Sequence, residues 1–363
     1  MTTAGGIIDP GQDDAARQAK RERFYGYLNK VGGTLNAFGL GFFIPIIKIC
    51  LGDTPKHQLR ELQQQLLIPI IGIGVFLAAW AYLAPQVQTS LGAVPGPAQV
   101  FEQVGNLYDA HNKERAKEEK FYARQDARNA KLIAAGKEDR VKHRTYTGAP
   151  TYLDQIWTSL KTVALGFIIA TIVAVPLGIM CGLSRVVNGA LNPLIQIFKP
   201  VSPLAWLPIV TMIVSAVYLN PSEALPKSLL ISSITVTLCS MWPTLINTAL
   251  GVSSIDKDLL NVGRVLQLPT WRTITKLVLP SSLPLIFTGL RLSLGVGWMV
   301  LIAAEMLAQN PGLGKFVWDE FQNGSSQSLA KIMVAVLTIG LIGFLLDRLM
   351  FALQAAFTFS NNR

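Results

Sequence analysis

The stretch DKDLLNVGRVLQLPTWRTITKLVLPSSLP, residues 256–284, separates two long apolar segments and determines how the rest of the chain is interpreted. A membrane protein reverses direction with only a few residues. This insert is much longer, carries lysine and arginine, and contains Pro269, Pro280 and Pro284, and we expect prolines to stop its helices. We therefore expect an amphipathic, helical surface that binds something on the cytoplasmic side of a membrane.

The composition indicates an integral membrane protein built from α-helices. Half of the 363 residues are hydrophobic and 15% are charged, whereas a soluble domain has roughly 25% charged residues. Several apolar segments approach the ~18–20 residues needed to cross a bilayer. Basic cytoplasmic loops explain the net charge of +10. No soluble stretch combines aromatic and basic residues as a nucleic-acid platform would, so we expect no nucleic-acid partner.

About six transmembrane helices are predicted, and lysine and arginine in the short loops set their direction. The basic loops after the second and fourth spans share one face, which places that face and both termini in the cytoplasm. Gly178-x-x-x-Gly182 in the second span predicts a close approach between two helices. The spans cover residues 66–83, 156 or 161 to 183, 201–219, 229–250, 285–307 and 332–353.

The segments outside these spans define the predicted regions of the chain. Residues 35–51 are apolar but short and contain Pro45 and Lys48, so we interpret them as interfacial or re-entrant, with an extra span as the alternative. The charged insert 109–144 is predicted on the outer side, either as a solvated helix or hairpin or as a contact surface for a partner. The regions are a tail with the apolar segment (1–65), the first span and the start of an external loop (66–108), the charged insert (109–150) and a core domain (151–363) with the loop 251–283.

No pattern in the sequence indicates catalysis or a bound cofactor. The phosphate-binding pattern GxxxxGK[ST] is missing, and Gly312-Leu-Gly-Lys315 is interpreted as a turn before an amphipathic helix. The histidines are scattered without ligand spacing. The cysteines, Cys50, Cys181 and Cys239, lie in apolar segments and indicate packing rather than a metal site or a disulfide. We therefore expect no metal, no bound cofactor and no enzymatic activity in this chain.

The fifth span carries the main candidates for contact with a transported solute. Arg291, Trp298 and Glu305 recur every seven residues, which brings them within about 20° of one helix face. Ionisable residues inside a membrane usually face a bundle interior or an aqueous path, and a cation there suits a small anion. The alternative is that Arg291 and Glu305 reach the two membrane surfaces. Weaker candidates in other spans are Ser202, Trp206 and Trp242.

Two interpretations of the 256–284 insert follow from its pattern. Leu259, Leu260 and Val262 form one short apolar face, and Pro269 begins a second short helix. Such a bent pair suits a groove on a partner protein. An amphipathic helix lying on anionic lipid fits the same pattern.

At this insert the sequence resembles the permease subunit of a type I ABC importer. That family carries a loop with the pattern EAA-x-x-x-G, then about nine residues, then an aliphatic residue and Leu-Pro. Here Asn261, Val262 and Gly263 replace the EAA, Gln267 replaces the glycine, and the ending is Val278-Leu279-Pro280.

Two further runs narrow the resemblance. LPSSLPLIFTGLRLSLGVGWMVLIAAEM, residues 279–306, is similar to the subgroup that imports nitrate, bicarbonate, cyanate, sulfonates and taurine. The run at 191–210 resembles the nitrate branch. The resemblance covers about residues 66–357 except the charged insert. That insert and about the first sixty residues match extended nitrate permeases of Gram-negative bacteria more loosely.

The resemblance implies a machine in the bacterial inner membrane. Two copies of the permease would form the pathway, two separate cytoplasmic ATPase subunits would hydrolyse ATP, and a periplasmic or lipid-anchored binding protein would deliver the solute. Each loop would sit in a groove of an ATPase. The residues so implied in ATPase coupling are Leu260, Asn261, Val262, Gly263, Arg264, Gln267, Pro269, Trp271, Arg272, Lys276 and Pro280.

The implied substrate is a small inorganic anion, with nitrate (alone or with nitrite) ahead of the alternatives. The same machinery would suit bicarbonate, cyanate, an alkanesulfonate or taurine. An ATP-independent ion channel is a more distant alternative, because a channel needs no loop that docks on an ATPase.

Overall fold

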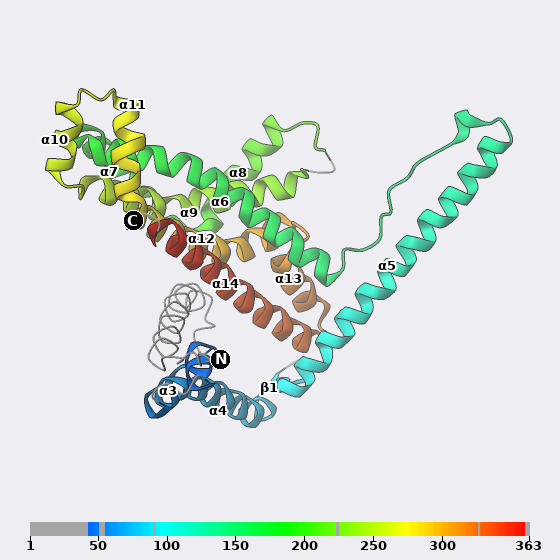
Figure 1. Cartoon of the computed structure of the whole chain (residues 1–363). Coiled ribbons are helices and arrows are strands. Elements are labelled where there is room, and N and C mark those ends of the chain that lie inside the picture. Colours follow the sequence, from blue (N-terminus) through cyan, green and yellow to red (C-terminus); the bar gives the residue numbers. More distant parts are fainter. Residues whose placement is uncertain (1–42, 51–54, 90–91, 223–224, 326, 360–363) are drawn as a thin grey trace, which may run out of the picture. The chain divides into compact units, whose positions relative to one another are not determined.

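The computed structural model describes residues 43–50, 55–89, 92–222, 225–325 and 327–359, and most of them are helical. Figure 1 shows these helices along the chain. A two-stranded antiparallel hairpin pairs β1 (Gln88–Thr89) with β2 (Gly92–Ala93). The helical segments are α2 (Phe43–Cys50), α3 (Pro55–Leu62), η1 (Gln63–Leu67), α4 (Ile68–Leu83), η2 (Ala84–Gln86), α5 (Pro97–Ala134), η3 (Glu138–Arg140), α6 (Tyr152–Leu183), α7 (Arg185–Phe198), α8 (Pro203–Val217), α9 (Lys227–Ser253), α10 (Lys257–Val265), α11 (Thr270–Thr273), η4 (Ile274–Val278), α12 (Leu279–Ala308), α13 (Leu313–Asn323) and α14 (Ser328–Phe359).

The chain divides into two compact units. One contains the described residues of 1–76 with those of 348–363, and the other is 77–347. In the first unit, α2 covers the second half of the apolar segment 35–51. With 8 residues it is about 12 Å long, too short to cross a bilayer. The rest of that segment lies outside the described residues, so its interfacial or re-entrant character stays a prediction.

Among the residues that the structure describes, five helices are long and apolar enough to cross a membrane, and they overlap the first, second, fourth, fifth and sixth predicted spans. They cover Leu59–Gln86, Tyr152–Leu183, Lys227–Ser253, Thr270–Ala308 and Ser328–Phe357. The helical membrane fold expected from the composition is thereby confirmed, with one short β-hairpin besides the helices.

The predicted third span, 201–219, contains one helix, α8, whose 15 residues are fewer than the ~18–20 needed to cross a bilayer. Helices α7 and α8 are long and apolar enough to cross a membrane only together, and they meet at a bend of 103°. Pro200 and Pro203 lie at the junction, where proline disfavours continuation of a helix. The Ser202 hydroxyl accepts a hydrogen bond from the backbone N–H of Leu204 at 3.2 Å and so caps the start of α8.

Helix α9 packs along both α6 and α12 in the larger unit. A Cβ atom at Gly178 of α6 would lie 2.6 Å from Thr248 Cβ, and one at Gly182 would lie 2.5 Å from Val252 Cβ. These distances are too short for any side chain, so both glycines are needed for the contact with α9. The close helix approach predicted from Gly178-x-x-x-Gly182 is confirmed.

Hydroxyl groups add polar contacts between α9 and α6. The Ser233 hydroxyl donates to the carbonyl of Thr162 at 3.2 Å, and the Thr237 hydroxyl donates to that of Gly166 at 3.0 Å. Such interhelical hydrogen bonds are typical of membrane helices with small residues at their interface. They fix α6 and α9 relative to each other, and α12 packs against both of these helices.

Candidate functional site

The loop between α9 and α12 begins with α10, whose end is closed by two backbone hydrogen bonds. The N–H of Leu268 donates to the carbonyl of Gly263, and the N–H of Gln267 donates to that of Arg264, both at 3.0 Å. This pair of bonds is the Schellman arrangement, in which the residue after the cap takes a left-handed conformation. Gln267 has φ of +49°. Gln267 is also the residue that replaces the glycine of the EAA-x-x-x-G pattern, so the structure explains why glycine suits that position.

Gly263, which replaces the second alanine of that pattern, is buried where α10 meets η4. A Cβ atom there would lie 2.9 Å from Leu277 Cδ1. Any residue other than glycine would therefore require the end of the Leu277 side chain to move. The loop is thus a packed helical corner rather than an open chain.

The apolar residues of the loop are divided between its inner and outer sides. Leu259, Leu260, Ile274 and Val278 pack into a cluster with buried residues of α6 and α9. The outer set consists of Val262 (51% exposed), Val265 (82%), Leu266 (64%) and Trp271 (73%). The expectation of one face formed by Leu259, Leu260 and Val262 is therefore wrong, because the two leucines are partly buried in this cluster and Val262 is exposed.

The second helix of the loop does not end before the membrane. A single helical stretch runs from Thr270 to Ala308, so the expected stops at Pro280 and Pro284 are wrong. The π-helical turn η4 precedes Pro280, and the N–H of Leu279 bonds to the carbonyl of Ile274. This wider turn accommodates the missing N–H of the following proline.

Arg291 of α12 is joined to α14 by a two-pronged ion pair. Its Nε lies 2.5 Å from Asp347 Oδ1, and its Nη2 lies 2.8 Å from Asp347 Oδ2. The two side chains remain 36% and 38% exposed. They line a cavity of about 230 Å³ together with Leu294, Gly295, Trp298, Gly343 and Leu346.

Trp298 shares this cavity and fixes the spacing between α12 and α14. Its indole N–H donates to the carbonyl of Ile339 at 3.0 Å, and the side chain is 6% exposed. The seven-residue spacing therefore brings Arg291 and Trp298 to one cavity. Asp347 belongs to this group too, but no periodicity relates it to Arg291.

Glu305 lies elsewhere and is fully enclosed in the protomer. Its carboxylate accepts from the Ser159 hydroxyl at 2.9 and 2.8 Å and from the N–H of Gly314 at 3.0 Å. The N–H of Leu313 in turn donates to Ser159 Oγ at 2.8 Å. Glu305 thus ties α6 to the start of α13. This position suits a structural carboxylate better than a residue lining the path, and it differs from the alternative of reaching the membrane surface.

The remaining candidates are not brought together. Ser202 caps α8, as described above. Trp206 packs against Phe198 across the α7–α8 bend, with their ring centroids 5.7 Å apart. Trp242 packs against the buried cluster of Ala174, Cys181, Ile195 and Leu245. Within the described part of the chain, the indole N–H groups of Trp206 and Trp242 have no hydrogen-bond partner.

Comparison with known proteins places this arrangement among transport proteins. Residues 174–358 match the family described as binding-protein-dependent transport system inner membrane component. The bicarbonate transport system permease protein CmpB of Synechococcus elongatus is 35% identical over 298 residues, 81% of this chain and 90% of that protein.

Nitrate permeases are similar over a shorter stretch. The nitrate import permease protein NrtB of Leptolyngbya laminosa is 40% identical over 195 residues, 54% of this chain and 65% of that protein, slightly less than two thirds of its length. NrtB of a Synechocystis species is 37% identical over 201 residues, 55% of this chain and 68% of that protein.

The family match runs without a break through α9, the packed loop and α12. The multi-pass membrane architecture agrees with it. From these findings together, the chain belongs to the family of inner membrane components of binding-protein-dependent transport systems.

Proposed function

We propose that this chain is the membrane subunit of an ATP-driven importer of a small planar oxyanion, with nitrate as the substrate. The observation that carries the proposal is the bidentate contact of Arg291 with a carboxylate inside a cavity of about 230 Å³. A carboxylate presents two oxygens in one plane, as nitrate and bicarbonate do, and the arginine fork matches this geometry. On this proposal, Asp347 and the transported anion alternate as the partner of Arg291.

Weak binding suits this role. An importer has to release its anion, and an unopposed cation would hold it. Asp347 competes with the anion for the Arg291 guanidinium and keeps the site nearly neutral when no anion is bound. Arg291 and Trp298 are therefore the residues proposed to meet the substrate.

The exposed apolar set Val262, Val265, Leu266 and Trp271 is proposed to dock in a groove of a cytoplasmic ATPase subunit. Exposed apolar residues on a rigid helical corner are typical of an interaction site. The family name supports an external binding protein as a further partner. A second copy of the chain completes the pathway, and ATP is hydrolysed by the partner subunits.

Bicarbonate is the second candidate, because the bicarbonate permease of Synechococcus elongatus matches a larger share of this chain than the nitrate permeases described above. Cyanate and alkanesulfonates, including taurine, are alternatives within the same machinery. An ATP-independent ion channel is the alternative to an importer. Deletion of residues 260–276 would abolish coupled import and leave a channel's conductance intact.

The deciding experiment is ATP hydrolysis by the purified permease–ATPase complex in lipid, with its binding protein, titrated with nitrate, bicarbonate, cyanate and taurine. Stimulation by nitrate supports the proposal. Stimulation by another of these anions keeps the importer and replaces the substrate. If no ATPase associates with the permease, the coupling role of the loop is wrong.

A further inference from the structure

The charged insert forms a defined arm made of the second half of α5 and the segment 141–150 that returns along it (Figure 1). The Asn129 amide donates to the carbonyl of Lys142, the Gln125 side chain accepts from the N–H of Arg144, and the Tyr122 hydroxyl accepts from that of Tyr146. The hydrogen bonds thus recur every two residues along the extended segment and about once per turn along the helix. The return segment is held in a fixed register.

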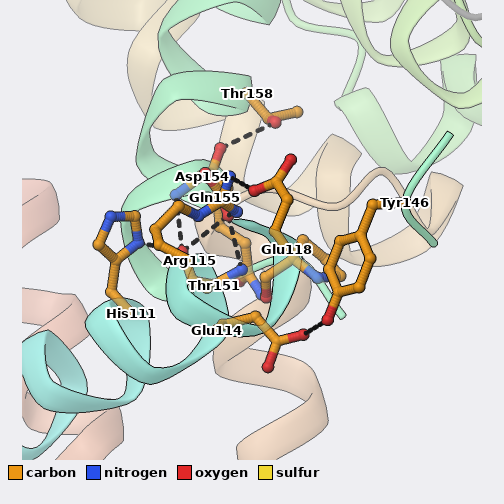
Figure 2. A network of polar contacts seen from close by, with 10 residues as sticks. His111, Glu114, Arg115, Glu118, Tyr146, Thr151, Asp154, Gln155 and Thr158 are labelled. Atoms are coloured by element: carbon orange, nitrogen blue, oxygen red, sulfur yellow. Dashed lines mark hydrogen bonds and ion pairs between the residues drawn. The ribbon is translucent and has the colours of Figure 1, made fainter. Parts of the chain in front are cut away.

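The base of the arm is joined to α6 by a network of paired charges and hydrogen bonds (Figure 2). Arg115 contacts Asp154 at 2.7 Å and Glu118 at 2.5 Å. The Tyr146 hydroxyl donates to Glu114 at 2.6 Å. At the base, opposite charges face each other and are neutralised locally.

Charges on the outer half of the arm are arranged differently. Arg124 and Arg128 of α5 face Lys142 and Arg144 of the return segment, and these four cations line one groove of about 190 Å³ with Phe121 and Gln125. Within the described residues, none of the four forms an ion pair. Like charges at this spacing repel one another, so the groove is favourable for an anionic partner.

We propose that this basic groove binds an acidic segment of a protein on the outer side of the membrane. The four cations lie in two rows. Arg124 and Arg128 are about 6 Å apart by helical rise, and Lys142 and Arg144 are about 7 Å apart by extended geometry. Two rows with these repeats suit several carboxylates along a polypeptide, whereas a single small anion reaches only part of them.

A lipid surface fits the groove less well. A helix that lies on a bilayer needs an apolar face beside its cations. The closely spaced exposed apolar residues of α5, Phe101, Val104 and Tyr108, lie in its first half, whereas the outer half exposes only Tyr122 and, near its end, Ile133. In the outer half, the Phe121 ring is instead used inside the arm, where its centroid lies 5.5 Å from that of Tyr146.

The test uses the full chain in nanodiscs of zwitterionic lipid, titrated with fluorescent polyglutamate at low ionic strength. The variant combines Arg124→Gln, Arg128→Gln, Lys142→Gln and Arg144→Gln. We expect its affinity for polyglutamate to fall about tenfold, because exposed charge pairs contribute little singly but add over four sites. Binding by the unmodified chain should weaken with salt.

The matched control removes the same charge from the arm outside the groove, with Lys113→Gln, Lys120→Gln, Lys131→Gln and Lys137→Gln. We expect it to bind polyglutamate within about twofold of the unmodified chain, and circular dichroism should show equal helicity in all three proteins. An equal loss in the control would show a general charge effect and overturn the proposal.

Two competitors separate the other occupants. If inorganic phosphate saturates the groove and polyglutamate does not bind, the groove is a small-anion site. Preferential binding to vesicles containing phosphatidylglycerol would make it a lipid contact. Either result, or no binding of polyglutamate by the unmodified chain, overturns the proposal.

Discussion

Arg291 and Asp347 are joined across α12 and α14 by two parallel contacts, Nε to Oδ1 at 2.5 Å and Nη2 to Oδ2 at 2.8 Å. The pair connects α12, which continues from the loop after α9, to α14, the last described helix. Both side chains stay partly accessible from the adjoining cavity. An ionic contact of this kind holds two helices together and is open to a competing anion.

The ion pair predicts non-additive effects on stability. Arg291→Gln and Asp347→Asn should each lower the free energy of unfolding, and the double variant should cost less than their sum by about 1 kcal/mol. Thermal unfolding of the solubilised protein measures this coupling. Additive costs would show that the contact contributes nothing to stability.

The proposed passage of anions predicts a further effect of Asp347→Asn. Freeing the Arg291 fork should let nitrate stimulate ATP hydrolysis at a lower concentration while maximal turnover falls, since the anion is released more slowly. Arg291→Lys, which keeps the charge but loses the fork, should raise the required concentration. Unchanged nitrate dependence in both variants would remove Arg291 from the path.

Gly178→Ala should destabilise the protein by about 1–3 kcal/mol, because its Cβ would meet Thr248 Cβ at 2.6 Å and the backbone carbonyl of Leu245 at 2.8 Å. Gly189→Ala is the matched control. It lies in α7, and an added Cβ atom there would meet nothing within 4 Å, so it should be neutral or slightly stabilising. Equal unfolding temperatures for both variants would contradict this account of the α6–α9 contact.

The left-handed conformation of Gln267 predicts a rank order of substitutions. Gln267→Gly and Gln267→Asn should be neutral or stabilising, while Gln267→Val should cost about 1–2 kcal/mol, because a β-branched residue is disfavoured at φ of +49°. Unfolding temperatures of the purified variants check this order. A stable Gln267→Val variant would show that α10 ends differently in solution.

The enclosed carboxylate of Glu305 should tolerate an amide better than a deletion. Glu305→Ala leaves the Ser159 hydroxyl and the N–H of Gly314 without their acceptor and should cost about 3 kcal/mol. Glu305→Gln retains one acceptor oxygen and should cost about 1 kcal/mol. If both variants are stable but fail to transport, Glu305 serves the path rather than the fold.

Docking of the return segment at the base of the arm should weaken both at low pH and at high pH. The hydrogen bond from Tyr146, with Lys117, lowers the pKa of Glu114 below its ordinary value of 4.5, and Glu114 raises the pKa of Tyr146 above 10.0. The contact therefore stabilises the docked arm fully between these two ordinary values. It is lost as pH falls through the lowered pKa of Glu114 or rises through the raised pKa of Tyr146.

Limited proteolysis of the return segment measures this docking. Cleavage should increase beyond either end of the pH range, and Tyr146→Phe should remove the alkaline transition while leaving the chain folded. An unchanged alkaline transition in Tyr146→Phe would assign it to another group.

Local patterns in the sequence predicted features that depend on neighbouring residues. Runs of apolar residues located the spans, and Gly178-x-x-x-Gly182 predicted a contact that needs only small side chains. The partner of Arg291 was not predictable in this way, because Asp347 lies 56 residues away. Nor did spacing reveal that Glu305 is enclosed, since Ser159 comes from a different helix.

Proline was the main source of error in the predicted elements. Pro200 and Pro203 do lie at a break, the 103° bend between α7 and α8, but Pro280 and Pro284 lie inside a continuous helix. The difference is the π-helical turn before Pro280, which relocates the hydrogen bonds that proline lacks. Such a turn has no sequence signature strong enough to predict it.

That turn also has a mechanical consequence. Trp271 and Arg291 belong to one helical stretch, Thr270–Ala308, so a partner that binds the exposed indole, as proposed, would act on the end of a lever. The wider turn at 274–278 is its compliant joint, because a π-helical turn and an adjoining proline leave fewer regular hydrogen bonds to resist bending. A force on the indole would bend the helix at this turn and tilt its membrane-crossing part. The Arg291–Asp347 ion pair, which joins that part to α14, would resist the tilt.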